Sequence, residues 1–385
     1  MKNELLIKES MINKILELSD AGSCPFYIYD TDTILQNCKK FTDIPYNPKS
    51  IHFALMANAN PQFVRIIKNA GLNVFVNSLL HLDLVRELGY DGEEIVYAAS
   101  AMDDETMSRA QSCHSIVVLD SPGQLARWQE LFPDTRVSIR CNIGELVVPQ
   151  KTRAGYFIGK ESRLGFMVDE IRELAGNKTI TGLHSYVGTD IMDIDYFMEC
   201  YEQMANLAEL FPKLRFLDFG GGFGLGDDIE RHIDLESYSL KIKGLMTELS
   251  EKLGREIRLL LEPGRIIGGE AGLFVCKVVD IKKRDGQQLI GVNASCVQFP
   301  RPLFYPDSAF HPVTVIHRKD KVDTVKKYDS SVFGCSTYSR DFLTRNVQLP
   351  ETSVGDLVIM GYAGSYCAGL YTKFLGFPEV QEYFI

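Results

Sequence analysis

One repeated pattern constrains the fold more than any other feature of the chain. From Ser50 onward, a short β-branched or aromatic run, a turn and a segment with helical spacing follow one another repeatedly. Eight such runs predict strands, at residues 51–57, 73–78, 94–99, 115–120, 136–142, 180–187, 215–219 and 257–261. Strands that alternate with helices pair in parallel through right-handed crossovers, and eight such units close into a barrel of about 250 residues. The sequence therefore predicts an α/β fold with a TIM-type (β/α)8 barrel over residues 34–271.

The segments between these strands are predicted to be helices. Pro61 stands where the first of them begins, a position that tolerates proline because its N–H would have no partner within the helix. The predicted helices span residues 61–69, 80–88, 104–112, 123–131, 193–210 and 235–253.

The pattern changes after Arg265, because strand-like runs then follow one another without helices between them. These runs are residues 272–281, 288–294, 312–317, 323–328 and 356–361. They predict a C-terminal antiparallel β domain over residues 272–385. The early run PFYIYD, residues 25–30, has no place in the barrel count. We therefore expect residues 1–33 to join the β domain and to supply one of its strands.

Charge and hydropathy exclude several functional classes. Fifty-one acidic against forty-one basic residues give a net charge of −10, which repels a nucleic-acid backbone or an anionic membrane surface. No apolar run approaches the roughly 18 residues that a membrane helix needs, and the first ten residues are charged where a signal peptide would be apolar. We expect a cytoplasmic protein that acts on a small molecule.

The cysteines and histidines predict neither a disulfide framework nor a metal site. The nine cysteines are an odd number and none stands in a CxxC pair, and the seven histidines lack HExxH spacing. Reduced, mostly buried thiols are the expected state.

Chemistry in a barrel of this kind collects at the C-terminal ends of the strands. The seventh predicted strand ends in Gly220, Gly221 and Gly222, whose N–H groups could converge on an anion such as a phosphate. The alternative is a simple tight turn. The eighth predicted strand ends in Glu262, which is either a solvated loop residue or the partner of a buried cation. Arg265 follows three residues later and could bind a phosphate.

The sixth predicted strand adds aromatic groups to the same end of the barrel. Strand alternation puts His184 and Tyr186 on one face, and Gly188 and Thr189 follow with a backbone N–H and a hydroxyl. His184 could also be a satisfied polar residue of the barrel mouth. A flat ring, a glycine turn and a carboxylate at one mouth predict a phosphorylated heteroaromatic cofactor.

This ordered set of motifs resembles the pyridoxal-phosphate-dependent decarboxylases of the alanine racemase fold type, which include diaminopimelate, ornithine and arginine decarboxylases. The resemblance covers nearly the whole chain, through FYIYD, HFALMANANP, GLHSYVGTD, LDFGGGFG, LEPGR, FPRPLFY and GYAGSY. It implies a barrel with a C-terminal β domain, pyridoxal 5'-phosphate as cofactor, and a head-to-tail homodimer with active sites at the subunit interface.

The resemblance also implies roles for individual residues. Glu262 would keep the pyridine nitrogen protonated, and Tyr186 would take the place of a histidine that stacks on the ring. The phosphate and the ring surroundings would involve Gly220, Gly221, Gly222, Arg265, Tyr366, Arg140 and His184. Arg301 and Tyr305 match the RPxxY pattern through which the diaminopimelate enzymes bind a distal carboxylate.

Several positions depart from the family pattern. The cofactor-binding lysine belongs in a motif of the form YAxKANxxP, and here that position is Met56, which can neither form an imine nor move a proton to Cα. The places often held by Asp and Glu near residue 78 carry Phe75 and His81, and the lysine often found after the third strand is Met102.

The late motif GPxCxxxD departs as well. By count its cysteine is Thr337, although Cys335 lies two residues away and a shift of register could restore a thiol, and the neighbouring acid is Tyr338. The predicted specificity loops, residues 147–162 and 329–336, contain Lys151, Arg153 and Lys160, which could meet an anionic substrate or face solvent.

Two functions remain open from the sequence. The first is a pyridoxal-phosphate-dependent amino-acid decarboxylase, similar to diaminopimelate decarboxylase but without the lysine. The second is a lysine-free relative that binds pyridoxal phosphate or its amino-acid adduct as a carrier, sensor or regulator. Met56 could result from engineering or from natural divergence, and the accompanying changes favour divergence. Different chemistry through Tyr186, His184 or Thr337 is a third possibility.

Overall fold

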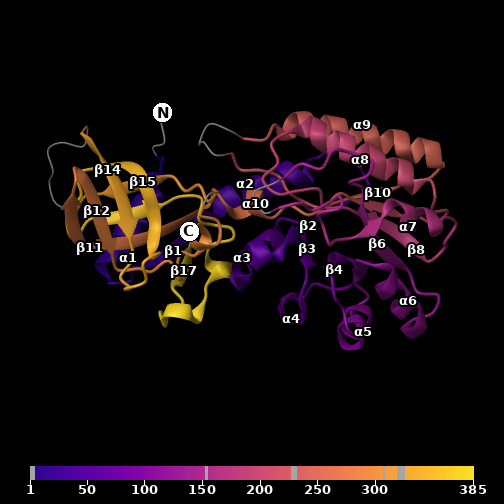
Figure 1. Ribbon diagram of the computed structural model, residues 1–385, viewed down its shortest axis with the longest axis horizontal. Helices are drawn as coiled ribbons and strands as arrows, with labels where there is room; N and C mark the ends of the chain where they lie inside the picture. Colours follow the sequence, from indigo (N-terminus) through magenta and orange to yellow (C-terminus); the bar gives the residue numbers. More distant parts are fainter. Residues whose placement is uncertain (1–4, 152–154, 227–231, 307, 319–325) are drawn as a thin grey trace. The chain divides into compact units, whose positions relative to one another are not determined.

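The computed structural model of the protein divides the chain into two units (Figure 1). It describes residues 5–151, 155–226, 232–306, 308–318 and 326–385. One unit comprises described residues 35–226 and 232–264, and the other comprises 5–34 and 265–385. One division between them lies inside helix α2 (Thr31–Thr42), and another lies shortly after the last barrel strand.

The larger unit is a closed barrel of eight parallel strands, as the sequence predicts. Each strand pairs in parallel with its neighbours in the order β5-β4-β3-β2-β10-β9-β8-β6, and a β5–β6 pairing closes the ring. A two-residue strand, β7 (Phe166–Met167), pairs with β6 outside the ring. The barrel strands are β2 (Lys49–Ala54), β3 (Asn73–Val76), β4 (Ile95–Ala98), β5 (Ile116–Leu119), β6 (Val137–Asn142), β8 (Ile180–His184), β9 (Phe216–Asp218) and β10 (Arg258–Leu261).

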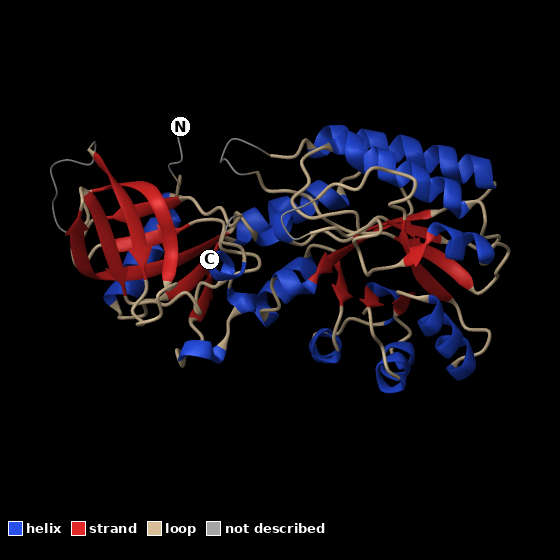
Figure 2. Cartoon of the chain, in the orientation of Figure 1, coloured by secondary structure: helices blue, strands red, loops and turns tan. Residues whose placement is uncertain are grey.

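Helices surround the barrel strands (Figure 2), and all six helices predicted there are present. Local caps fix where several of them begin: the Asn60 side chain accepts N–H bonds from Gln62 and Phe63 ahead of α3, and Ser121 caps α6 in the same way. No helix of the described residues is long and apolar enough to cross a membrane. The helices are α3 (Pro61–Asn69), α4 (Leu79–Glu87), α5 (Asp104–Ser112), α6 (Pro122–Leu131), α7 (Val168–Glu173), α8 (Ile194–Ala208) and α9 (Leu235–Leu253), with 3-10 turns η1 (Leu55–Ala57) and η2 (Gly92–Glu94).

Most barrel strands end slightly earlier than the sequence predicts, and two of them show the largest difference. The predicted strand 51–57 stops at Ala54, because the chain turns into η1 once the Ala54 N–H has bonded to the Pro263 carbonyl beside it. The predicted strand 180–187 stops at His184, after which the Ser185 N–H bonds to the carbonyl of Asp218. At both points the chain turns at the carboxyl rim of the barrel, where the sequence predicts the functional residues.

Large apolar side chains from opposite strands fill the barrel. Phe216 and Leu260 pack with Val96 and Val118, and the half-buried Phe75 lies against this cluster. Gly182 on β8 makes room for the Phe216 ring, since a Cβ there would lie 2.1 Å from Phe216 Cζ. The barrel interior is therefore a packed core.

We expect Gly182→Ala to destabilise the barrel by about 1–3 kcal/mol, because it forces extra volume into a filled core. The matched control is Gly244→Ala in α9, where an added Cβ meets open space and alanine favours the helix by up to about 1 kcal/mol. Thermal unfolding of both variants measures the difference. A Gly182→Ala variant that unfolds at the wild-type temperature would contradict this packing.

The smaller unit is built around one sheet. Its strands run in the order β13-β16-β11-β12-β14-β15, and β1 pairs with β11 on one side and β17 on the other. The antiparallel β1–β11 pairing confirms that the early PFYIYD run joins the β domain. The strands are β1 (Phe26–Tyr29), β11 (Gly272–Arg284), β12 (Gln287–Val292), β13 (Val313–Ile316), β14 (Lys327–Phe333), β15 (Phe342–Pro350), β16 (Leu357–Met360) and β17 (Gln381–Phe384).

The β domain differs from the prediction in three ways. The β12–β14 and β1–β17 pairings are parallel, so the sheet is mixed. The predicted strand 323–328 lies partly outside the described residues, and β14 instead runs on to Phe333 through part of the predicted loop 329–336. Strands β15 and β17 and the amphipathic helix α1 (Glu9–Asp20), which packs on β1 and β11, were not predicted. Pairing with neighbours overrides the polar composition of β14 and β15.

Candidate functional site

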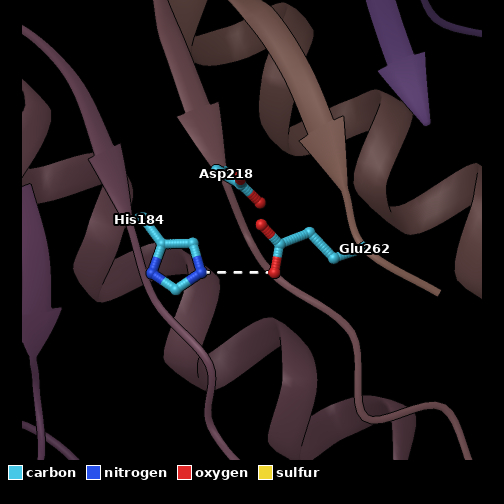
Figure 3. A group of neighbouring side chains, drawn as sticks. All are labelled: His184, Asp218 and Glu262. Atoms are coloured by element: carbon cyan, nitrogen blue, oxygen red, sulfur yellow. Dashed lines mark hydrogen bonds and ion pairs between the residues drawn. The ribbon is translucent and has the colours of Figure 1, made fainter. Parts of the chain in front are cut away.

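Three neighbouring strands bring a histidine and two carboxyl groups together at the carboxyl rim of the barrel (Figure 3). His184 ends β8, Asp218 ends β9, and Glu262 directly follows β10. Their side chains are almost completely buried. One imidazole nitrogen of His184 and one carboxyl oxygen each of Asp218 and Glu262 lie within 4.8 Å of one another. The sequence placed His184 and Glu262 at this rim but missed Asp218, although it precedes the glycine turn by only one residue.

Hydrogen bonds connect part of this cluster. His184 Nε2 lies 3.3 Å from Glu262 Oε2, and Asp218 Oδ1 accepts the Gly220 N–H at 2.9 Å. The remaining carboxyl oxygens, Asp218 Oδ2 and Glu262 Oε1, find no hydrogen-bond donor in the described part of the chain. Figure 3 shows the Asp218 and Glu262 carboxyl groups facing one another. Two facing carboxyl groups can bond only when one of them carries a proton.

Burial sets the charge state of all three groups. It raises the pKa of Asp218 well above its ordinary range, and the neighbouring Glu262 charge raises it further. Burial raises the pKa of Glu262 to about 8, against the hydrogen bond with Asp218 and the positive charge of Arg140. Burial lowers the pKa of His184 to about 4. At neutral pH the imidazole is therefore neutral, and burial favours the protonated form of Asp218.

The glycine turn passes directly over the backbone of Glu262. Gly220 and Gly222 have φ values of +64° and +94°, and a Cβ on Gly221 would lie 2.2 Å from the Glu262 carbonyl oxygen. Only glycine fits these positions without moving the backbone. Within the described residues, the N–H groups of Gly221 and Gly222 donate to no protein acceptor. The turn can therefore offer N–H groups to an anion.

Arg140 and Tyr186 lie in the barrel unit, as the resemblance implies. Arg140 on β6 is largely buried, and its Nε lies 3.9 Å from Asp120 Oδ1. Burial lowers its pKa, but Asp120 and Glu262 oppose the shift. The Tyr186 ring packs edge-on against Phe157 at 4.8 Å between ring centroids, and burial raises the pKa of its phenol to about 12. The phenol is therefore neutral at neutral pH.

The departures from the family pattern have different surroundings. Phe75 stacks on the His184 ring, with 6.4 Å between centroids and 9° between planes. Met56 lies half-buried in η1, just past the end of β2. His81 lies in the first turn of α4, where its N–H donates to Ser78 Oγ, and Met102 is buried. Phe75 is therefore the departure whose ring contacts the cluster.

A residue at the end of β6 that the sequence analysis did not single out, Asn142, anchors the predicted specificity loop. The Asn142 amide nitrogen donates to the carbonyls of Gly159 and Leu164, and its oxygen accepts the Gly159 N–H at 2.6 Å. These bonds hold the segment that carries Phe157 toward Tyr186. Lys151 and Lys160 are exposed, and Arg153 lies outside the described residues.

The β unit contains four further predicted site residues. Arg301 is buried and its guanidinium lies over the Tyr305 ring, 5.1 Å from the ring centroid, so the RPxxY pair is associated. Arg265 begins helix α10 (Arg265–Gly268), and Tyr366 has a φ of +52°. Their roles toward a phosphate or a carboxylate stay predictions.

The late motif forms a loop held by its final aspartate. The buried Asp341 carboxylate accepts N–H bonds from Cys296 at 2.6 Å and from Ser336 at 2.9 Å. Cys335 and Thr337 are exposed on this loop, and the Tyr338 ring packs edge-on against Phe374. Their catalytic and substrate roles likewise stay predictions.

The fold and the rim cluster define a TIM-barrel protein of the kind that holds a cofactor at the carboxyl ends of its strands. Residues 31–269 match the family described as pyridoxal-dependent decarboxylase, pyridoxal binding domain. The chain therefore belongs to the pyridoxal-dependent decarboxylase family, a family of lyases that use pyridoxal 5'-phosphate.

Relatives with this architecture are similar along almost the whole chain. The chain is 28% identical to the diaminopimelate decarboxylase of Methanothermobacter thermautotrophicus and 26% identical to that of Aquifex aeolicus, over 95% of this chain and 88% and 87% of those proteins. The crystal structure of Helicobacter pylori diaminopimelate decarboxylase complexed with L-lysine has a TM-score of 0.85 at 23% identity, covering 96% of this chain and 93% of that one. The lysine/ornithine decarboxylase of Vibrio vulnificus complexed with putrescine has a TM-score of 0.83 at 20% identity, covering 99% of both chains. The similarity to these two crystal structures shows a shared fold.

The residues present fit the cofactor's ring and phosphate but not its covalent attachment. The buried Glu262 carboxyl suits a ring N–H, and the glycine turn suits a phosphate. Met56 offers no amine at the motif position of the lysine.

The shifted pKa of Glu262 predicts a pH-dependent stability. Because that pKa rises to about 8 on folding, the folded chain binds a proton that the unfolded chain has already released, and stability falls as the pH rises toward 8. Glu262→Gln removes this titration. We therefore measure the melting temperatures of the cofactor-free variant and wild type between about pH 7 and pH 8.5, where His184 is mostly neutral in the folded and the unfolded chain. We expect the melting temperature of the variant minus that of wild type to increase over this range. A difference that stays constant over this range would contradict the shift.

Proposed function

We propose that this protein is an amino-acid decarboxylase similar to diaminopimelate decarboxylase, which binds pyridoxal 5'-phosphate without a lysine link. The observation that carries the proposal is the buried Glu262 carboxyl, held between His184 and Asp218 beside the Gly221 turn. Membership of the family and similarity to diaminopimelate decarboxylases along 95% of the chain support it.

The residues of the barrel unit have separate tasks in this proposal. The Glu262 carboxylate accepts a hydrogen bond from the ring N–H, and its burial excludes the water that would compete for that bond. N–H groups of the turn at Gly221 and Gly222 bind the phosphate, and the Tyr186 ring contacts the cofactor ring. When bound, a protonated pyridine ring withdraws the electron pair that loss of carbon dioxide leaves on the substrate Cα.

The substrate is an amino acid with a distal carboxylate. Arg301 and Tyr305 supply the recognition, because a guanidinium binds a carboxylate with two parallel hydrogen bonds and the tyrosine ring fixes its direction. By resemblance, the protein forms a head-to-tail homodimer in the cytoplasm. The Met56 thioether neither forms an imine nor returns a proton to Cα, so turnover is slow.

A second candidate is a binding protein for pyridoxal phosphate or its amino-acid adduct, without turnover. Met56 is the observation that favours it, because affinity needs the glycine turn and Glu262, whereas catalysis in the family also needs the lysine. Regulation or delivery of the cofactor would then be the function.

An absorbance experiment tests these proposals. The purified wild type, Met56→Lys and the control Met56→Leu are each incubated with pyridoxal phosphate, desalted and mixed with amino acids that carry a distal carboxylate. We expect retained cofactor in all three, a band of lysine-bound cofactor only in Met56→Lys, and faster carbon dioxide release by that variant than by wild type.

The outcomes separate the two candidates. Carbon dioxide release by wild type above the level of free pyridoxal phosphate, or strong release by Met56→Lys, supports the decarboxylase. Cofactor retention without release by any variant supports the binding protein. Failure of folded wild type and both variants to retain pyridoxal phosphate would overturn both.

A further inference from the structure

The facing carboxyl groups of Asp218 and Glu262 leave one interaction of the cluster unexplained. Asp218 Oδ2 and Glu262 Oε1 are both buried, and no N–H or O–H of the described residues reaches either of them. Leaving two such acceptors desolvated costs several kcal/mol unless they share a proton or a cation. No motif assigned a function to Asp218, and the roles implied by the family resemblance do not use it.

The charges around this pair do not neutralise two ionised carboxylates. From β6, Arg140 supplies one positive charge, but its nearest acid is Asp120. From β8, His184 is a neutral imidazole and Tyr186 a neutral phenol, and from β3 the group that stacks on His184 is the apolar Phe75. The surroundings therefore favour one proton held between the two carboxyl groups.

We propose that Asp218 is a positioning residue whose protonated carboxyl donates to Glu262 Oε1, while the neutral His184 donates its Nε2–H to Glu262 Oε2. The Glu262 carboxylate is then held from both sides by uncharged donors, and it alone would carry the negative charge opposite a pyridinium nitrogen. This inference rests on the proposed function, because the ring nitrogen of pyridoxal phosphate is the group that Glu262 meets.

The proton balance follows from this arrangement. With a pyridinium nitrogen held at Glu262, one carboxylate would face one positive charge, and Asp218 would keep its proton. If Asp218 were ionised as well, two negative charges would face one positive charge in a buried site. Asp218 thus prevents a charge mismatch, and it tethers the glycine turn through the Gly220 N–H at 2.9 Å.

Two variants separate donation by Asp218 from simple packing. Asp218→Asn keeps an N–H donor toward Glu262 and an oxygen toward Gly220, whereas Asp218→Ala keeps neither. The ligands are pyridoxal phosphate and an analogue with the same phosphate and aldehyde but a carbon in place of the ring nitrogen. We expect Asp218→Ala to lose about 10- to 100-fold in affinity for pyridoxal phosphate, the range for a hydrogen bond to a charged group, and far less for the carbon analogue. Asp218→Asn should stay within about threefold of wild type for both ligands.

Infrared spectroscopy of the cofactor-free protein tests the shared proton independently of binding. Wild type at pH 7 should show a protonated carboxylic acid band that Asp218→Asn weakens. The control is Asp356→Asn in the β unit: burial raises the pKa of Asp356, but hydrogen bonds from His317 and from the Arg318 and Ser353 N–H groups outweigh it and lower the pKa. The band should be unchanged in that variant.

Three results would overturn the inference. They are the absence of an acid band in folded wild type, an equal loss of affinity for both ligands in Asp218→Ala, and a stoichiometric divalent cation retained by dialysed wild type. If wild type binds neither ligand, the proposed function fails, but the infrared comparison still decides whether Asp218 holds the proton.

Discussion

The parallel closure of eight strands is the constraint on which the rest of the structure depends. Because all eight run in one direction, their carboxyl ends meet at one rim, and residues far apart in sequence become neighbours there. His184, Asp218 and Glu262 come from consecutive strands of the ring, β8, β9 and β10. The same closure fills the interior with apolar side chains, so that polar groups at the rim are desolvated from below.

Desolvation gives the rim its chemical character. Histidine and carboxyl groups in water would be charged to a large extent near neutral pH, whereas here burial pushes His184 and Asp218 toward their neutral forms. The turn at Gly221 lies so close to Glu262 that a side chain there would collide with the backbone. The turn and the acid are therefore held at a fixed separation.

The regular part of the fold was predictable, and the contacts of the site were less so. Short β-branched or aromatic runs and helical spacing located all eight barrel strands and six of the helices, because burial against a common core selects apolar residues in those patterns. Strand β15 was missed because many of its side chains are exposed and its order comes from pairing with β14. Asp218, Asn142 and the Phe75–His184 stack depend on contacts between distant segments, which spacing along one segment does not reveal.

The central claim is that Glu262 meets the ring nitrogen of a bound pyridoxal phosphate and keeps it protonated. Nitrogen NMR of the wild-type protein with ring-¹⁵N-labelled pyridoxal phosphate measures this directly, with Glu262→Gln for comparison. The account predicts a chemical shift characteristic of a protonated pyridine in wild type and a move toward the unprotonated value in the variant. An unprotonated ring nitrogen in bound wild type, or the same shift in both proteins, would contradict it.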